Sequence, residues 1–496
     1  MSKIKSYAIF LNLALYSPTI ELHQSHIKQI KKKNQDSRIL AIVCDGKFGG
    51  CSVNPFGSPT ICNFCIKRAR YVVKQENIGF VYLSSFDLPE SKSTFSENRL
   101  FWAGSMSSVA SHTRVESVRD LNRVWHFIYK RLFKASRRTY FSVANIIQQY
   151  QINHLYLYNG RFSCAKAAKE AARALMINFS VYDVRRSVNP YVHHNKDLHN
   201  VFECFDRAKT MYSKNPEISR QDAIKYFNSR GKSSLFGASY TTKMKVGEVG
   251  NIDNSKKIIT IYTSSDDEYR FLGQDWGIQQ QAISQFKEIE YICKNLDLHN
   301  WQIVIRIHPN QTGVRTNSLR KIKLLNQLSN VTVCEPDSPI DTYELLDISD
   351  LIVCFASSIS LEAAYRKKTI IQIGSSPYSI IDIGYIVCNG KEAVNFINSW
   401  QDDFYSIPSK DNINAFVYAN YLLNYKDDLP AFSKIGPYYM VDGKKVPLNT
   451  FGRLLQMPEK FIIPLSKSEN IFSYAFLRKC GSYLLSIIQG RFYTVK

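Results

Sequence analysis

The sequence predicts an α/β protein built from two doubly wound domains. The chain has 496 residues, which exceeds one ordinary domain and suits two domains of roughly 200–250 residues each. Short apolar runs of strand length alternate with helical patterns in both halves of the chain. Several of these runs end in small polar turns, as the strands of a parallel sheet do where they lead into a helix. A hydrophobic fraction of 45% is enough to fill both cores.

The first half opens with a β–α–β unit. An apolar run at residues 7–15 is followed by a helical pattern at 20–33 and by a second apolar run at 38–44. A helix between two strands makes the strands parallel, so this unit is expected to start a doubly wound domain. Asp45 comes directly after the second run, as part of an Asp-Gly pair that is also an ordinary turn signal.

A second strand-to-helix turn follows further along this half. An apolar run at residues 154–158 ends in Asn159-Gly160-Arg161, and the alanine-rich stretch 163–175 predicts a strong helix. Residues 179–182 form the next predicted strand. Asn159 and Arg161 are therefore expected at the carboxyl edge of the sheet, where open parallel sheets bind ligands.

The second half repeats this alternation of strands and helices after a polar linker within residues 214–256. A strand at 257–262 is followed by Ser264 and Ser265, and a strand at 301–307 is followed by His308, Pro309 and Asn310. We expect a first domain at residues 1–250 with a cysteine-rich loop at 44–65, and a second domain at 256–400. The remaining segment, 401–496, is expected to be a helical, basic tail that packs across the domains.

Residues 350–374 form a compact strand–helix–strand unit with a serine-rich turn. Ser357, Ser358 and Ser360 lie between the apolar run 351–355 and a short helical pattern that contains Glu362. Hydroxyls and backbone N–H groups at a helix start suit a phosphate or diphosphate. Neither a Gly-x-Gly-x-x-Gly pattern nor a Walker lysine is present, which excludes a standard dinucleotide or P-loop site. A serine-capped helix of an ordinary α/β protein remains the alternative.

Three of these turns are expected to meet, because strands of a parallel sheet share one carboxyl edge. His308 could donate to a phosphate oxygen there, and Arg306, two residues earlier on the strand, would point to the same face. Glu362 could accept from a ribose hydroxyl. The alternatives are a structural histidine for His308 and a carboxylate that stabilises its own helix for Glu362.

The net charge of +22 indicates a polyanionic partner, which is nucleic acid, an anionic membrane or an anionic substrate. Basic residues gather at 28–33 and, mixed with aromatic residues, at 114–138. Neither segment carries a helix-turn-helix, RNA-recognition or zinc-finger signature, so no nucleic acid is expected. A solvated helix face is the plain alternative to contact with phospholipid. The sequence contains no signal peptide and no membrane-spanning run, and we expect a cytoplasmic protein, peripheral at the inner face of the cell membrane.

Four of the eleven cysteines lie close together in sequence. Cys44, Cys51, Cys62 and Cys65 follow the spacing Cys-x6-Cys-x10-Cys-x2-Cys. Four thiolates are enough for a structural zinc or an iron–sulfur cluster, although this spacing is not that of a standard finger. Four free thiols are the equal alternative. An odd number of cysteines in a chain without an export signal does not suggest a disulfide framework.

Four stretches resemble the GT-B-fold glycosyltransferases of bacterial capsule and lipopolysaccharide assembly. They are the cysteine-rich segment from Cys44-Asp45-Gly46 onward, residues 158–163, residues 306–310, and residues 357–364. The resemblance covers roughly residues 5–400. It implies two Rossmann-like domains that face a cleft, with the nucleotide-sugar in the C-terminal domain and the acceptor mostly in the N-terminal one.

The resemblance also implies roles for single residues. Asp45 would be the catalytic base, and Asn159 and Arg161 would lie on the acceptor side. The expected donor-binding residues are Ser264, Ser265, Arg306, His308, Asn310, Ser357, Ser358, Ser360 and Glu362. The His-Pro and Ser-Ser pairs resemble the CMP-binding motifs of bacterial sialyltransferases and related enzymes, which slightly favours a CMP-sugar. The acidic run at 266–268 departs from the sialyltransferase motif because no glycine follows it.

The sequence thus predicts a glycosyltransferase that extends a surface polysaccharide or a lipid-linked glycan and needs no cofactor for catalysis. A sugar-nucleotide epimerase or a glycerol-phosphate transferase on the same fold is the first alternative. A non-enzymatic polyanion-binding protein that uses the basic segment 114–138 is the second.

Overall fold

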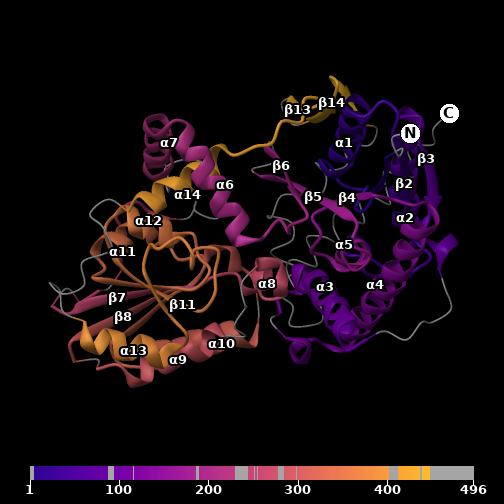
Figure 1. Cartoon of the computed structure of the whole chain (residues 1–496). Coiled ribbons are helices and arrows are strands. Elements are labelled where there is room, and N and C mark those ends of the chain that lie inside the picture. The colour runs from indigo at the N-terminus through magenta and orange to yellow at the C-terminus, as the bar shows by residue number, and fades with distance from the viewer. Residues whose placement is uncertain are drawn as a thin grey trace. The chain divides into compact units, whose positions relative to one another are not determined.

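The computed structural model describes residues 5–87, 94–115, 117–185, 189–229, 244–250, 252–253, 255–277, 284–297, 299–314, 316–400, 412–435 and 438–446. The chain forms two compact units, and each has its own sheet and core. The first domain comprises residues 1–198 together with 426–496, and the second domain comprises residues 199–425. Figure 1 shows the elements of both.

The first domain is built on a six-stranded sheet with the order β3-β2-β1-β4-β5-β6. The first five strands run parallel, and β6 runs antiparallel to β5. The strands are β1 (Ser6–Phe10), β2 (Arg38–Val43), β3 (Gly79–Tyr82), β4 (His154–Tyr158), β5 (Asn178–Arg185) and β6 (Asn189–His194). The helices are α1 (Thr19–Lys33), α2 (Pro59–Gln75), α3 (Phe95–Thr113), α4 (Arg123–Gln149) and α5 (Ser163–Ala174).

Local sequence signals explain where these helices begin. Thr94 and Glu97 form a reciprocal capping box at the start of α3, and the Asn122 side chain accepts from the backbone N–H of Trp125 at the start of α4. Pro59 occupies the first turn of α2, where its missing N–H costs no hydrogen bond. Two short 3₁₀ turns, η1 (Leu83–Phe86) and η2 (Val118–Asp120), precede α3 and α4.

The second domain is built on six parallel strands with the order β12-β11-β10-β7-β8-β9. Their bounds are β7 (Lys257–Tyr262), β8 (Trp301–Arg306), β9 (Val331–Cys334), β10 (Leu351–Cys354), β11 (Thr369–Ile373) and β12 (Tyr385–Val387). The helices are α6 (Val201–Lys214), α7 (Pro216–Ser229), α8 (Asp266–Tyr269), α9 (Gln285–Asn295), α10 (Asn317–Leu324), α11 (Thr342–Ile348), α12 (Ile359–Tyr365), α13 (Gly390–Ser399) and α14 (Ile413–Asn424). The described ranges of this domain also contain the 3₁₀ turns η5 (Gly273–Trp276), η6 (Pro309–Gln311) and η7 (Leu325–Gln327).

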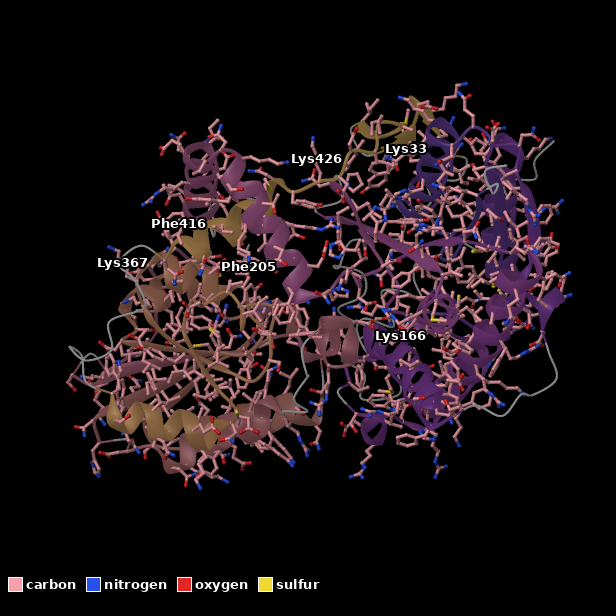
Figure 2. All side chains as sticks on the ribbon, viewed as in Figure 1. Lys33, Lys166, Phe205, Lys367, Phe416 and Lys426 are labelled. Carbon is pink, nitrogen blue, oxygen red and sulfur yellow. The ribbon has the colours of Figure 1, made fainter. Side chains whose placement is uncertain are left out.

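Both faces of this second sheet are buried. Ile259 and Ile303 belong to the core layer that packs with α9 and α13, whereas Ile352 and Ile370 belong to the layer that packs with α6, α7, α12 and α14. Phe416 of α14 is a member of this second layer, and Phe205 of α6 packs against the layer; Figure 2 labels both side chains. Strands covered on both faces explain why their sequences are continuously apolar rather than alternating.

Numbered within their own domain, the strands of both sheets follow the order 3-2-1-4-5-6 of a doubly wound, Rossmann-like fold. The predicted fold class is therefore confirmed as two Rossmann-like domains in one chain, which is the domain content of a GT-B-like fold. In this strand order the crossovers reverse direction between β1 and β4 in the first domain, and between β7 and β10 in the second.

The compact units divide the chain at residue 198, whereas the sequence suggested a boundary near residue 250. The reason is that α6 and α7 pack in the core layer of the second domain.

The described part of the C-terminal segment also differs from a helical tail. Helix α14 belongs to the second domain, and residues 426–446 return to the first domain as the antiparallel strands β13 (Phe432–Ile435), β14 (Tyr438–Val441) and β15 (Lys444–Lys445). Residues 447–496 lie outside the described residues.

Among the helices of the described ranges, none combines the length and the apolar composition that crossing a bilayer requires.

Candidate functional site

Three polar turns lie at neighbouring strand ends in the second domain. Strand β7 is followed by Ser264 and Ser265, β8 by His308, and β10 by Ser357 and Ser358. Because β10, β7 and β8 are adjacent in the sheet, these turns share one carboxyl edge and span two strand spacings, roughly 10 Å. The edge contains the point between β7 and β10 where a doubly wound sheet binds its ligand. The predicted convergence of the three turns is therefore confirmed.

The turn after β7 is fixed by Gln285 at the start of α9. The side-chain oxygen of Gln285 accepts from the backbone N–H of Ser264 at 2.9 Å, and its amide nitrogen donates to the Ser264 hydroxyl oxygen at 2.9 Å. Both residues are buried. Sequence reasoning missed Gln285, because a glutamine in a helical pattern carries no signal of this contact.

The turn after β8 orients the imidazole ring of His308. The backbone N–H of His308 donates to Thr263 Oγ1 at 2.9 Å, and the ring atom Nδ1 accepts from the backbone N–H of Asn310 at 3.1 Å. A neutral ring whose Nδ1 accepts must carry its proton on Nε2. The turn therefore makes His308 Nε2–H a hydrogen-bond donor.

Ser265 links the first two turns. Its hydroxyl oxygen accepts from Asn310 Nδ2 at 3.4 Å and from Gln311 Nε2 at 3.3 Å. A hydroxyl that accepts two bonds retains its own proton for donation to a third group. Hydrogen bonds thus link the predicted residues Ser265, His308 and Asn310, and Ser264 is the chain neighbour of Ser265.

In the third turn, which follows β10, the serines have two different roles. Ser360 is fully buried, and its hydroxyl donates to the backbone oxygen of Ser357 at 2.9 Å, so it shapes the turn. The Ser357 hydroxyl accepts from the backbone N–H of Ile359 at 3.4 Å. Ser358 directly precedes α12, and its side chain makes no capping bond to that helix. Ser358 is half-buried.

Glu362 lies in the first turn of α12 and is buried. Its carboxylate is close enough to Tyr262, Cys354 and Tyr378 to act on their ionisation. Burial raises the pKa of Cys354 to about 12, and the Glu362 charge adds to this rise. Glu362 therefore lies near the last residues of β7 and β10, where the donor site is predicted.

Arg306 does not join the turns at the strand ends. Its Nη1 donates to the backbone oxygen of Glu335 at 2.6 Å, and its Nε donates to Thr342 Oγ1 at 3.4 Å. The side chain is fully buried, and this burial lowers the pKa of the guanidinium. Arg306 therefore donates to groups inside the domain, and it is not part of the proposed donor site.

The first domain carries a second polar group, at the ends of β4 and β5. Asn159 Nδ2 donates to Asp183 Oδ2 at 2.6 Å, and the Tyr158 hydroxyl donates to Asp183 Oδ1 at 2.6 Å. Asn159 has a left-handed backbone with φ of 64°, which asparagine tolerates better than most residues. Burial raises the pKa of Asp183 above its ordinary value despite these hydrogen bonds and the charge of Arg161.

Arg161 lies beside this group, with its guanidinium carbon 4.6 Å from the centre of the Phe162 ring. The structure thus brings the two predicted acceptor-side residues, Asn159 and Arg161, together with Asp183, which sequence reasoning missed. The available signal was an aspartate that follows the apolar run 179–182 directly.

Asp45 follows β2, as predicted, and is largely buried. Its Oδ2 accepts from the Ser84 hydroxyl and lies 3.6 Å from the ammonium nitrogen of Lys47. These contacts hold the carboxylate at the carboxyl end of β2.

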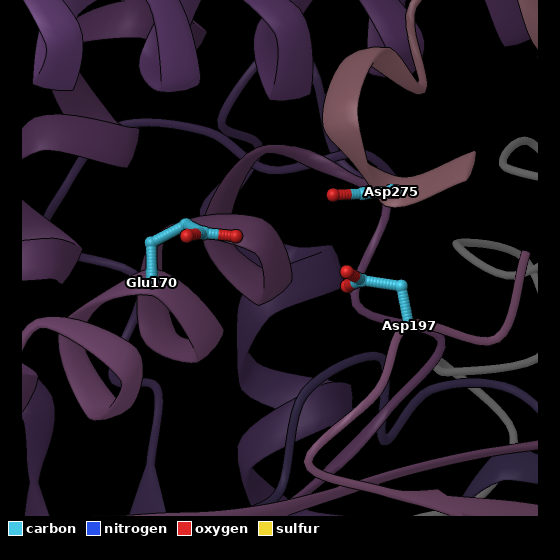
Figure 3. Close-up of side chains that lie close together, drawn as sticks. All are labelled: Glu170, Asp197 and Asp275. Atoms are coloured by element: carbon cyan, nitrogen blue, oxygen red, sulfur yellow. The ribbon is translucent and has the colours of Figure 1, made fainter. Parts of the chain in front are cut away.

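A different pair of carboxylates belongs to an ion-pair network in the first domain. Glu170 on α5 and Asp197 after β6 (Figure 3) both contact Lys169 and Arg173. Lys169 is almost fully buried, and Arg173 Nη1 lies 2.6 Å from Glu170 Oε1. Each of the two carboxylates contacts two cations in this network, so these buried charges have partners of opposite sign.

Comparisons with family models and with curated proteins find no match. Among solved structures, the chain is similar to the KpsC β-Kdo 2,4-transferase of Thermosulfurimonas dismutans, with 15% identity and a TM-score of 0.33 over 54% of this chain and 79% of that one. It is also similar to UDP-GlcNAc 2-epimerase of Methanocaldococcus jannaschii in complex with UDP-GlcNAc and UDP, with 11% identity and a TM-score of 0.28 over 83% and 98%. MurG of Acinetobacter baumannii matches with 11% identity and a TM-score of 0.24 over 85% and 95%.

Proposed function

We propose that this protein is a glycosyltransferase that takes a sugar from a nucleotide-sugar bound in its second domain and transfers it to a glycan or lipid-linked acceptor. One observation carries the proposal. Three turns with hydroxyl and imidazole donors meet at the strand-order reversal of a Rossmann-like sheet, and hydrogen bonds within the fold hold their side chains in place.

The donors suit the leaving group of sugar transfer. As the acceptor oxygen bonds to the anomeric carbon, the bond from that carbon to the phosphate oxygen breaks, and the electron pair stays on the phosphate. Donors aimed at this developing charge lower the barrier without a metal. The proposed donors are the hydroxyls of Ser264 and Ser265 and the Nε2–H group of His308. Ser358, in the third turn, is proposed as a further donor.

The acceptor hydroxyl must give its proton to a base. Asp45 is the candidate that the sequence named, and Asp183 is the candidate that the geometry adds. A carboxyl with a raised pKa is the better proton acceptor at neutral pH, and Asp183 has this property. Asn159 and Arg161 are proposed to bind the acceptor beside it.

A CMP-activated sugar stays the favoured donor, on the strength of the His308-Pro309 and Ser357-Ser358 pairs. The first experiment is a thermal-shift screen of the full chain against CMP, CDP, UDP and GDP. A nucleotide at 100 times its Kd should stabilise the protein by about 2.7 kcal/mol. His308→Ala should abolish the shift. His299→Ala is the matched control, because His299 is exposed and precedes the amino end of the same strand, β8.

Stabilisation by one nucleotide that His308→Ala removes and His299→Ala keeps supports the donor site. A well-folded protein that responds to none of the four nucleotides overturns it. The fate of the matching nucleotide-sugar then separates the enzyme classes. A transferase consumes it only with an acceptor present, an epimerase converts it without one, and a polyanion-binding protein leaves it intact.

A further inference from the structure

The net positive charge of the chain belongs to its first domain. That domain contains 40 Lys or Arg and 17 Asp or Glu, a net charge of +23, whereas the second domain contains 24 and 25, a net charge of −1. An excess of cations on one domain attracts polyanions to that domain. The nucleotide-sugar is proposed to bind the second domain, so the excess charge points to a different anionic partner.

Helix α2 presents part of this charge on its outer side. Its 17 residues contain no acidic side chain. Cys65, one of the cysteines predicted to bind metal, packs inward with Leu15. Lys67, Arg70 and Lys74 are exposed, and because they are three and four positions apart they lie along one side of the helix. The outer side of α2 is therefore a cationic stripe.

The stripe is not explained by ion pairs or by the helix dipole. In the described part of the chain, Lys67, Arg70 and Lys74 have no carboxylate partner. Glu76, which follows α2, is buried and lies 3.5 Å from Lys28. Lys74 is in the last turn, where the helix dipole favours a cation, but Lys67 and Arg70 lie in earlier turns and gain little from it. The charges of the stripe are thus open to a ligand.

Aromatic side chains accompany the stripe. Tyr71 follows Arg70 on α2, and Phe80 and Tyr82 lie on β3 with their ring centres 5.3 Å apart. Tyr71 and Tyr82 both pack against the core layer beneath α2, and Phe80, two residues before Tyr82, faces the same way. Phe80 is 38% exposed, and in the described sheet β3 pairs with β2 alone. Exposed rings therefore lie at the free edge of the sheet, on the face that α2 covers.

This face is not the one covered by α4, the helix of the basic segment 114–138. Right-handed crossovers on the two sides of a strand-order reversal place their helices on opposite faces of the sheet. Helices α1 and α2 therefore cover one face, and α4, which packs with α3 and α5, covers the other. One flat membrane can contact only one of these faces, so a second basic surface calls for a partner of another kind.

We propose that α2 and β3 together bind an acidic glycan, a chain whose sugars carry negative charge. Cations pair with its acidic groups, and the negative face of an aromatic ring attracts the C–H groups of a sugar ring. The inference rests on the proposed function, and it assigns an acidic class to the acceptor. The α2–β3 surface consists of six residues, Lys67, Arg70, Tyr71, Lys74, Phe80 and Tyr82.

Fluorescence anisotropy of the full chain with labelled polygalacturonate, and with labelled neutral dextran, tests the proposal. The wild type should bind the acidic polymer and not dextran, and added salt should weaken the binding. The α2 variant, with Lys67→Ala, Arg70→Ala and Lys74→Ala, should bind about tenfold more weakly, as expected for the loss of three exposed ion pairs. Phe80→Ala should weaken binding and keep its salt dependence, because it removes a ring and no charge.

Two controls match the α2 variant. The first replaces three lysines of the second domain by alanine, each of which pairs with a carboxylate on its own helix: Lys209, Lys225 and Lys294. The second is Arg123→Ala with Lys130→Ala on α4. Both should bind polygalacturonate like the wild type. The α2 variant should also keep the wild-type melting temperature, because the three side chains that it changes are exposed.

Equal binding of both polymers, an equal loss in the second-domain control, or a loss confined to the α4 control overturns the proposal. An α2 variant that loses binding to phosphatidylglycerol vesicles but keeps binding to polygalacturonate also overturns it. The thermal shift with nucleotide tests the proposed function separately, because the α2 variant should keep that shift.

Discussion

At the residue scale, the candidate donor site depends on a few hydrogen bonds that sequence could not show. The strand-end positions of Ser264, His308 and Ser358 followed from alternating strands and turns. The orientation of His308 depends on the backbone N–H of Asn310, and the Ser264 turn depends on Gln285, which is 21 residues away in sequence. Contacts over such separations come from the fold and leave no local pattern.

Gln285→Ala should therefore weaken both stability and nucleotide binding. It leaves the buried N–H of Ser264 without its acceptor, which costs about 1–3 kcal/mol. Urea unfolding measures the stability loss, and a nucleotide titration measures the binding loss. Gln285→Glu is the matched variant, because a carboxylate still accepts from that N–H but cannot donate to the Ser264 hydroxyl. Unchanged unfolding in Gln285→Ala would contradict this account.

Asp183→Asn should reduce turnover by about 10²–10⁴-fold with little change in donor binding, as expected for loss of a general base. The wild-type rate should fall as pH drops through the raised pKa of Asp183, because the protonated carboxyl cannot accept a proton. Initial rates across pH measure both effects. If Asp45→Asn causes the loss and Asp183→Asn does not, Asp45 is the base.

At the element scale, α4 is unusual in its charge. Its 27 residues contain no acidic side chain and six Lys or Arg side chains. Two of these are held inside the domain, since Arg138 pairs with Asp87 and Arg131 donates to backbone oxygens. Arg123 and Lys130 are exposed, and the Phe127 ring between them is 60% exposed. The basic segment that the sequence indicated is thus one helix with a mixed cationic and aromatic surface.

We expect this face of α4 to contact anionic phospholipid. Each Lys or Arg near such a surface contributes about 1 kcal/mol, so Arg123→Ala with Lys130→Ala should weaken binding by roughly 30-fold. Co-sedimentation with vesicles containing phosphatidylglycerol measures this loss. Lys225→Ala with Lys294→Ala is the control, since both lysines pair with carboxylates on their own helices. Equal binding to neutral vesicles would contradict the expectation.

At the scale of the whole molecule, the order of elements was predictable and the domain limits were not. Repeated strand–turn–helix patterns indicate two Rossmann-like sheets directly. Helices α6 and α7 belong to the second domain because they pack against α14. Asn424 of α14 donates to Asp222 of α7 at 3.0 Å, and the two residues are 202 positions apart in sequence. A polar linker pattern at 214–256 cannot report such a contact.

Stability should fall on acidification, because the first domain buries neutral histidines. Burial lowers the pKa of His23 to about 4, of His26 to about 3 and of His154 to about 4, from an ordinary value of 6.5. Below pH 6.5 the unfolded chain therefore binds more protons than the folded chain. The folded state loses stability as the pH falls from 6.5 toward 4. Burial raises the pKa of Glu21 to about 7, which opposes this trend.

Melting temperatures at pH 7 and pH 5 measure the effect. His154→Gln should lose less stability between these two values than the wild type, and the exposed His299→Gln should behave like the wild type. An equal pH dependence in all three would contradict the histidine explanation.

The return of residues 426–446 to the first domain has a consequence for synthesis. Asp427 accepts from the backbone N–H of Val192, Asp442 pairs with Lys28, and Leu429 and Phe432 pack with Leu22 and Tyr182. The second domain is thus inserted within the first. On the ribosome, the N-terminal sheet emerges early but lacks part of its covering layer until more than 200 further residues have been translated. The inserted domain can complete its fold before the domain that encloses it in sequence.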